Sequence, residues 1–315
     1  MGCCATWTAS SCWNATSDVA SSAGGSWCRI LATAPARALV VPRRRRIEVP
    51  ALIKRITAVW QRREILGTLV QRDLRVRYSR SVLGYVWTVL DPLLMASVYF
   101  VVFTFIFKAG RVADTPYFLY LLSGLLAWQW FTGAVTDTTK SLIQEARLVR
   151  STNLPREVWV IRCVIAKGVE YVLSLPILVG FVIYYLVKGR VDLDWELLLF
   201  PLGVGLQFLL LVGLGLILAP ITVLATDMQR VVRIFLRFFF YLSPVLYGLH
   251  SVPDQLRAVL VLNPLNGILS LYRGGLFERS VSWVDVGVSV AMSLLFIVVG
   301  FWTFSRLERS VLKEI

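Results

Sequence analysis

The sequence predicts an all-α integral membrane protein with six transmembrane helices, an N-terminal amphipathic helix at the membrane interface and short gate helices between spans five and six. Apolar residues make up 57% of the 315 residues and charged residues only 17%, whereas a soluble chain usually carries ~25% charged residues. The mean hydropathy of +0.69 agrees with this imbalance. Long apolar runs alternate with shorter polar segments along most of the chain. A chain of this composition has lipid as its main solvent.

The first 41 residues do not follow this pattern. They are rich in Ser, Ala and Thr, and they show neither helical nor strand periodicity. They contain no uninterrupted apolar stretch typical of a cleaved signal peptide. The opening Met1-Gly2-Cys3-Cys4 fits an N-myristoylation pattern, but the match is short. We therefore interpret residues 1–41 as an unstructured leader.

A basic segment, residues 42–81, precedes the first apolar run. Residues 43–80 contain twelve Lys or Arg and three acids, which is +9 of the net charge of +14. From Pro50 onwards apolar residues recur at helical spacing with basic residues between them, which predicts an amphipathic helix. Basic amphipathic helices beside membrane spans usually lie in the interface and bind anionic lipids. We expect this position on the cytoplasmic surface, and we expect no nucleic acid as a partner.

The membrane domain, residues 82–315, contains six apolar runs. About 20 apolar residues in a helix cross a hydrocarbon core of ~30 Å. The fifth run is short, carries Arg237 and contains Ser243-Pro244, which indicates a tilted or broken helix. The runs cover 82–107, 117–135, 161–187, 197–225, 234–249 and 284–304.

The segment between the fifth and sixth runs, residues 251–281, is only partly apolar. Pro253, Pro264 and Gly274-Gly275 interrupt it. These interruptions predict two short helices that dip into the membrane surface rather than a full span.

The distribution of basic residues predicts the orientation. With six spans, the side that holds both termini carries 25 Lys or Arg and the other side carries 7. Cytoplasmic loops are enriched in Lys and Arg. We therefore expect a multi-pass membrane protein with both termini in the cytoplasm.

Signs of catalysis are few. The sequence has no Gly-x-x-x-x-Gly-Lys-Ser/Thr phosphate loop, so we expect this chain neither to hydrolyse ATP by that route nor to be an enzyme. With a single histidine, His250, we expect no histidine-rich metal site and no Ser–His triad. We expect this chain to have no catalytic residues, no metal and no cofactor. Asp192-Leu193-Asp194 imitates the Asp-x-Asp motif of membrane glycosyltransferases, which leaves that class as an alternative. Its two acids would lie on the outer face.

Ionisable residues within the spans are functional candidates, because their burial in lipid is costly. Asp91 precedes Pro92 in the first run, where the proline bends the helix locally. Lys167 and Glu170 are three residues apart in the third run and share one helix face. We expect these two to form a structural ion pair.

Aromatic residues recur in the first and fifth runs, and two interpretations of them stay open. They could pack against lipid and neighbouring helices, or they could line a pore in which flat rings guide a sugar chain without direction-locking hydrogen bonds. The candidate channel-lining residues are Tyr99, Phe103, Phe107, Phe235, Phe239 and Tyr247.

Several motifs follow one another between residues 50 and 315. The first comprises Arg72, Asp73, Leu74, Arg75, Val76, Arg77, Tyr78, Ser81, Leu83, Gly84, Trp87 and Pro92, with Asp91 beside it. The later ones are 153–157 (Asn-Leu-Pro-Arg-Glu), 242–247 (Leu-Ser-Pro-Val-Leu-Tyr) and 262–265 (Leu-Asn-Pro-Leu). Together they resemble ABC-2-type polysaccharide-export permeases, the membrane subunits that export O-antigen, teichoic acid and related lipid-linked glycans. The family often has Arg before Asp227, where this chain has Thr226.

The resemblance implies a half-transporter. Two copies would pair around a channel for a lipid-linked glycan, and two separate ATP-binding cassette subunits would bind Mg-ATP below it. Asn153, Leu154, Pro155 and Arg156 would couple to the ATPase. The two short helices, with Asn263 and Pro264, would close an outer gate. An exporter of drugs or other small molecules shares this architecture and remains a further alternative.

Overall fold

The computed structural model describes six stretches of the chain, and their regular structure is helical. These are residues 57–79, 81–106, 116–191, 193–248, 260–277 and 281–314. No strand occurs within these ranges, in agreement with the predicted all-α fold. Several predictions lie outside the described residues: the leader 1–41, the first part of the interface segment, Phe107, Asp192, His250 and the first half of the gate segment.

Five helical segments of the described residues are long and apolar enough to cross a membrane. They coincide with the first four and the last of the predicted runs, which confirms those five helices. They are α3 (Trp87–Val101) with its flanking turns η1 (Gly84–Val86) and η2 (Val102–Ile106), α4 (Tyr117–Gln144), α6 (Glu157–Val187), α7 (Phe200–Leu224) preceded by η3 (Trp195–Leu199), and α11 (Trp283–Glu314).

The fifth run differs from the other five. Its helix, α8 (Met228–Leu242), has 15 residues, a length of ~22 Å at 1.5 Å per residue. It begins upstream of the predicted start and ends at Leu242, because Ser243 is extended (φ −95°, ψ 142°) before Pro244. A helix of this length does not cross ~30 Å of hydrocarbon unaided. The count of six spans therefore stays a prediction.

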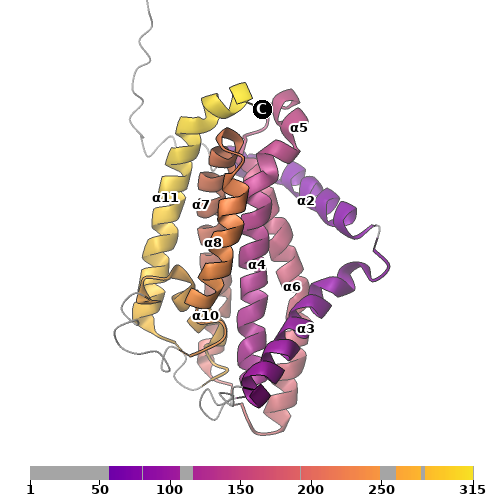
Figure 1. Ribbon diagram of the computed structural model, residues 1–315, viewed down its shortest axis with the longest axis vertical. Helices are drawn as coiled ribbons and strands as arrows, with labels where there is room; N and C mark the ends of the chain where they lie inside the picture. The colour runs from indigo at the N-terminus through magenta and orange to yellow at the C-terminus, as the bar shows by residue number, and fades with distance from the viewer. Residues whose placement is uncertain are drawn as a thin grey trace, which may run out of the picture. The chain divides into compact units, whose positions relative to one another are not determined.

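The core is built around α4, which packs against α6 on one side and α7 on the other (Figure 1). α11 lies along α7, and the two backbones approach closely at Gly213 and Gly300. A Cβ atom added at Gly213 would lie 2.6 Å from the carbonyl carbon of Phe296, and one at Gly300 would lie 2.6 Å from the carbonyl oxygen of Gly213. Small residues allow such backbone approach between membrane helices. The α7–α11 contact therefore requires glycine at both positions.

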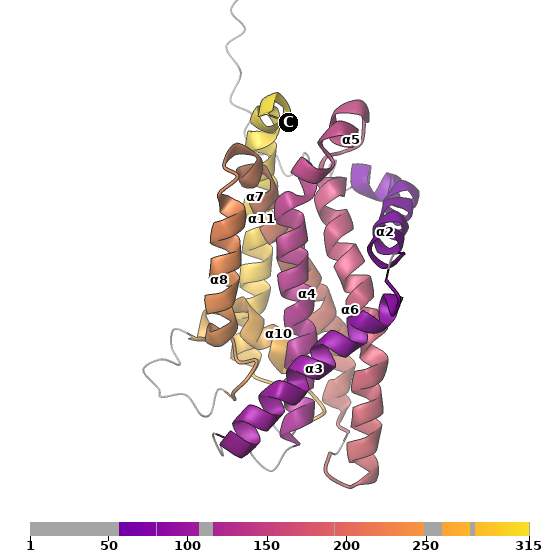
Figure 2. The same cartoon turned by 45° about the vertical axis from the view of Figure 1, so that its right-hand side comes forward.

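Shorter helices mark the two ends of the bundle. α5 (Ala146–Ser151) and the C-terminal end of α11 lie at one end, whereas α10 (Pro264–Arg273) lies toward the other (Figures 1 and 2). α2 (Arg63–Tyr78) lies beside the bundle nearer the α5 end (Figure 2). The helix predicted before the first span and one of the two predicted gate helices are therefore present. By the predicted orientation, the α5 end would be cytoplasmic.

Candidate functional site

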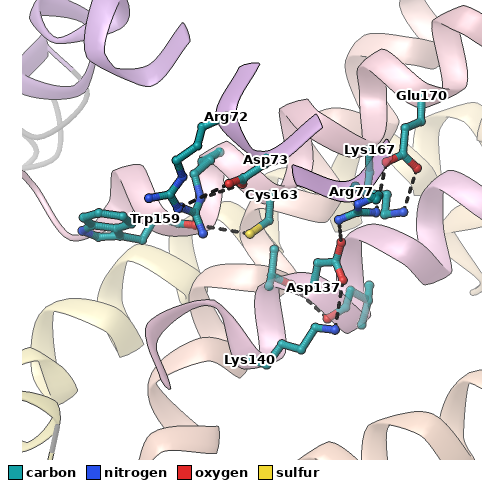
Figure 3. Close-up of polar contacts among 12 residues, drawn as sticks. Arg72, Asp73, Arg77, Asp137, Lys140, Trp159, Cys163, Lys167 and Glu170 are labelled. Carbon is teal, nitrogen blue, oxygen red and sulfur yellow. Dashed lines mark hydrogen bonds and ion pairs between the residues drawn. The ribbon is translucent and has the colours of Figure 1, made fainter. Parts of the chain in front are cut away.

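The amphipathic helix α2 lies against α6, close to the C-terminal half of α4. Its buried apolar face is narrow, with Val70 and Leu74 packed on Ala166 of α6. Charged side chains make further contacts, between residues 72–78 and α4 and α6 (Figure 3). The ion pairs form two groups, one around Arg77 and one around Arg162.

Arg77 joins α2 to both neighbouring helices. Its Nη2 atom lies 2.6 Å from Oδ2 of Asp137 on α4, and its Nη1 atom lies 3.0 Å from Oε1 of Glu170 on α6. Lys140 adds a second cation, 3.4 Å from Oδ1 of Asp137. Burial lowers the pKa of Arg77, but the hydrogen bond and charge of Asp137, with the charge of Glu170, outweigh burial and raise that pKa above its ordinary value. Arg77 therefore stays charged while it bridges the two helices.

Arg162 on α6 is the centre of the second group, and its side chain is only 4% exposed. Its Nε atom lies 3.1 Å from Oδ2 of Asp73, and its Nη1 atom lies 3.3 Å from Oε1 of Glu145. Arg72 of α2 also pairs with Glu145, and the Trp159 ring centroid lies 5.2 Å from Cζ of Arg162. The carboxylates of Asp73 and Glu145 thus neutralise the guanidinium groups of Arg72 on α2 and Arg162 on α6. Removal of one partner would leave a charge that water reaches poorly.

The structure therefore brings Arg72, Asp73 and Arg77 of the first motif together at one interface. Sequence reasoning missed their partners. Except for Glu170, these partners lie at or beyond the ends of the second and third apolar runs, where a charge is normally interpreted as part of a loop. The helix α4 continues beyond the apolar run to Gln144. Helical spacing after residue 135 could therefore have indicated that Asp137 belongs to the helix and not to a loop. The missed residues are Asp137, Glu145 and Arg162.

A polar cavity of about 320 Å³ lies beside this network, between α3, α4 and α6. Tyr78, Trp87 and Asp91 of the first motif line it together with Lys167 and Glu170. The Nζ atom of Lys167 lies 2.7 Å from Oε2 of Glu170, which confirms the predicted ion pair. Burial and the charge of Glu170 raise the pKa of the Tyr78 hydroxyl, so it stays neutral. Asp91 is exposed, and no residue in the described ranges pairs with its carboxylate.

The predicted channel aromatics of α3 and α8 pack against one another and against α4. The ring centroid of Tyr99 lies 5.9 Å from that of Phe240, and Phe239 stacks on Phe235 at 5.4 Å. Phe103 packs edge-on against an aromatic ring of α4 at 6.3 Å. We call this group the aromatic seam; its members are Tyr99, Phe103, Phe235, Phe239 and Phe240.

The members of the seam differ in exposure. Phe235 is 59% exposed, whereas the other four are buried or half-buried. Tyr247 lies beyond the end of α8, and its hydroxyl donates to the carbonyl oxygen of Tyr241 at 3.0 Å. That bond turns the chain back toward the helix. Lining of a channel by these residues stays a prediction.

The predicted ATPase-coupling segment follows α5. Asn153 is exposed, whereas Leu154 is half-buried against the core. Pro155 is also half-buried, and Arg156 places its Nη1 atom 2.5 Å from Oε1 of Glu308 on α11. Asn153 is therefore the member of the four that a partner would reach most easily. The coupling role stays a prediction.

The 242–247 and 262–265 motifs meet near the other end of the bundle. Asn263 caps α10, because its Oδ1 atom accepts from the backbone N–H of Leu265 at 2.9 Å. Its Nδ2 atom donates to Oγ of Ser243 at 2.9 Å. Pro264 takes the first helical position, where its missing N–H costs nothing. The predicted gate residues thus begin a buried helix and tie it to the break after α8.

Arg273 completes this arrangement from the last turn of α10. Its buried guanidinium donates to the carbonyl oxygens of Pro244 at 2.8 Å, Val245 at 3.2 Å and Tyr120 at 3.3 Å. It also lies 3.5 Å above the ring centroid of Tyr120. Pro244 and Val245 follow the end of α8, so their carbonyl groups have no donor within a helix, and Arg273 donates to both. Sequence reasoning treats this residue only as one of the outer basic residues.

Asp194 of the glycosyltransferase alternative caps the turn η3. Its carboxylate accepts from the backbone N–H of Trp195 at 2.7 Å. The other acid of that motif, Asp192, lies outside the described residues. Local capping therefore accounts for Asp194 without catalysis.

Known proteins resemble this chain over most of its length. Residues 64–277 match the family described as ABC-2 type transporter. The chain is 30% identical to the O-antigen export system permease protein RfbA of Myxococcus xanthus over 265 residues, which cover 84% of this chain and 98% of that protein. It is 27% identical to RfbA of Klebsiella pneumoniae, covering 78% and 92%, and 24% identical to the polysialic acid transport protein KpsM of Escherichia coli, covering 77% and 91%. This chain, with its long apolar helices, belongs to the ABC-2 type transporter family.

Proposed function

We propose that this chain is the permease subunit of an ATP-driven exporter that moves a lipid-linked polysaccharide across the bacterial plasma membrane. The observation that carries the proposal is the likeness, over more than nine-tenths of the relatives' length, to proteins named for O-antigen export and polysialic acid transport. Five long apolar helices support a membrane path. The excess of basic residues on one side supports cytoplasmic termini.

ATP hydrolysis belongs to a partner in this proposal. Two ATP-binding cassette subunits bind Mg-ATP beneath a homodimer of the permease, and the permease itself holds no cofactor. The exposed Asn153 supports a docking place beside α5. The ion pair between Arg156 and Glu308 ties that place to α11, so a displacement there would reach a long helix of the bundle. The basic helix α2 rests on anionic lipid at the same membrane surface.

The path for the glycan runs along the aromatic seam, with Phe107 and Tyr247 as further lining residues. Rings offer flat apolar faces on which sugar units can slide. The exposed face of Phe235 supports this role, because it remains uncovered within the described part of the chain. The helix α10, begun by Asn263 and Pro264, forms the outer gate.

Depletion of the protein tests the proposal. We expect a lipid-linked glycan to accumulate in the cytoplasmic leaflet, to be identified by mass spectrometry of extracted lipids. Re-expression should clear it, whereas re-expression beside an ATPase subunit that cannot hydrolyse ATP should not. If no glycan accumulates and only sensitivity to a small molecule changes, the chain is a small-molecule exporter and the proposal is wrong.

A further inference from the structure

The helix α8 presents three different faces. Val232, Leu236 and Phe240 point into the bundle and are buried. A second face is apolar and exposed, with Phe235 and Phe238 among its members. The third face carries three exposed arginines at spacings of three and four residues, which places them on one side of the helix. These residues are Arg230, Arg233 and Arg237, and we call them the arginine stripe.

None of the three guanidinium groups has a protein partner among the residues that the structure describes: each is exposed, and no ion pair or hydrogen bond joins it to another side chain. The spans around α8 present a different surface. α7 contains no charged residue at all, and the exposed side chains of α3 include Leu94 and Val98. The row of three exposed cations distinguishes α8 from α7 and from α3, in which the one charged residue is Asp91.

Lipid cannot be the surroundings of the whole stripe. α8 runs alongside α4 within the bundle (Figures 1 and 2). An arginine facing hydrocarbon at the centre of a membrane helix costs at least ~2.5–3.5 kcal/mol. Arg230 and Arg233, near the start of α8, could reach lipid headgroups with their long side chains. Arg237 lies ~14 Å along the helix from Met228, at 1.5 Å per residue, about half the thickness of the hydrocarbon core. If α8 enters the hydrocarbon at Met228, Arg237 therefore needs water, an anion or a second copy of the chain beside it.

The position of the charges indicates what kind of anion this is. Beyond Arg237, α8 continues with Phe238, Tyr241 and Leu242 and contains no further cation. A glycan with a charge on every repeat would need cations along its whole path. A cationic stretch confined to the first half of the helix instead suits a substrate with one compact anionic group.

We propose that the arginine stripe binds the phosphate ester that joins the lipid to the glycan. The inference rests on the proposed function and deepens it, because it names the part of the substrate that this face takes. The planar guanidinium group donates two parallel hydrogen bonds to phosphate oxygens. The three guanidinium groups provide successive binding positions for the phosphate along one helix face, from the cytoplasmic end inward. The exposed rings beside them receive the apolar and sugar parts of the same molecule.

Lipid binding to the full-length chain tests this proposal without any transport. The purified protein is placed in nanodiscs of phosphatidylcholine and irradiated with a photocrosslinking polyprenyl diphosphate at increasing mole fraction. We expect saturable crosslinking to α8, competed by unlabelled polyprenyl diphosphate but not by polyprenol or by inorganic diphosphate. Arg237→Gln should weaken apparent binding at least tenfold, as expected for loss of a charge-assisted hydrogen bond. Arg237→Lys should retain part of it.

Matched variants keep the result unambiguous. Arg309→Gln removes an exposed arginine of α11 and should leave binding unchanged. If Arg237→Gln does not fold, Arg233→Gln provides the same comparison one turn nearer the cytoplasmic end. Equal crosslinking of polyprenol and polyprenyl diphosphate would overturn the proposal. So would arginine variants that alter only the oligomeric state, because the stripe would then be a contact between two copies.

The outcome is separable from that of the depletion experiment. Selective diphosphate binding in a protein whose loss causes no glycan accumulation would contradict the export function and leave the stripe as a lipid-phosphate site. Glycan accumulation on depletion, together with wild-type lipid binding by all arginine variants, would support export and refute the stripe.

Discussion

The arginines at the α2–α6 interface and those of α8 have opposite surroundings. Arg72, Arg77 and Arg162 each pair with at least one carboxylate, whereas the arginine stripe meets no acidic side chain in the described part of the chain. Breaking an ion pair that water reaches poorly leaves an uncompensated charge and destabilises the fold, most strongly at the buried Arg162. The exposed charges of α8 have no such compensation among the described residues. The first set should therefore control folding and the second set transport.

The largest expected effect is on stability, at Arg162. Arg162→Met leaves the carboxylates of Asp73 and Glu145 with less compensation in a poorly hydrated place. We expect a loss of ~3 kcal/mol, as is typical when one partner of a buried ion pair is removed. Thermal unfolding of the purified protein in detergent measures it.

The same change on α8 provides the contrast. Arg230→Met removes an exposed side chain without a described partner, so the stability should change by no more than about 0.5 kcal/mol. If both variants unfold together, or if Arg162→Met unfolds like the wild type, the distinction between paired and unpaired arginines fails.

Arg77→Gln should detach α2 with a smaller loss. Asp137 keeps Lys140 and Glu170 keeps Lys167 in this variant, so we expect ~1.5–2 kcal/mol, the lower part of the ~1.5–3 kcal/mol typical of hydrogen bonds to charged groups. Hydrogen exchange along residues 63–78 should become faster while exchange in α7 stays slow. Lys140→Gln removes the other cation beside the same carboxylate. Because Lys140 and Asp137 both belong to α4, this variant should leave α2 protected, and equal exchange in the two variants would contradict the bridging role of Arg77.

The sequence predicts long spans well and charged contacts poorly. Five spans are predicted by apolar length alone, because ~20 apolar residues have few other places to fold. α8 is harder, since its arginines shorten the apolar run at one end and Pro244 at the other. Its true start at Met228 lies within the polar loop that hydropathy indicates.

Contacts between charged residues that are far apart in the sequence cannot be predicted without the three-dimensional structure. Arg77 and Asp137 are 60 residues apart, and nothing in either segment names the other. Lys167 and Glu170 were predicted correctly, because their spacing on one helix fixes their distance. Arg273 shows the same limit, because two of its carbonyl acceptors, Pro244 and Val245, lie in the segment after α8 and the third, Tyr120, lies in α4.

The predicted coupling segment also contains an exposed residue, Asn153, and a paired one, Arg156. Asn153→Trp adds bulk to an exposed position. Overpacking of an interface costs ~1–3 kcal/mol, so ATP-driven export should fall about tenfold with normal stability. Arg156→Gln, which breaks the pair with Glu308, should lower the melting temperature instead. Transport in vesicles with the ATPase subunit measures the first effect. Unchanged export in Asn153→Trp would place the docking surface elsewhere.

The smallest expected effect concerns the aromatic seam. Tyr99→Leu, Phe103→Leu and Phe239→Leu keep apolar bulk, so each should cost less than ~1.5 kcal/mol of stability. A sugar-guiding surface needs the flat ring face, so export should slow about two- to fivefold, the effect of ~0.5–1 kcal/mol in a barrier. Pulse labelling of the glycan on each side of the membrane measures this rate.

Trp302 is the control for these three variants. It is 40% exposed on α11 and packs with Arg306 at 4.6 Å, away from the seam in sequence and in its contacts. Trp302→Leu should export at the wild-type rate. If it slows export as much as the seam variants do, ring loss acts through general packing. If the seam variants export normally, or fail to fold, their rings serve only to hold α3, α4 and α8 together, and the phosphate-binding arginines would be the remaining candidates for substrate contact on α8.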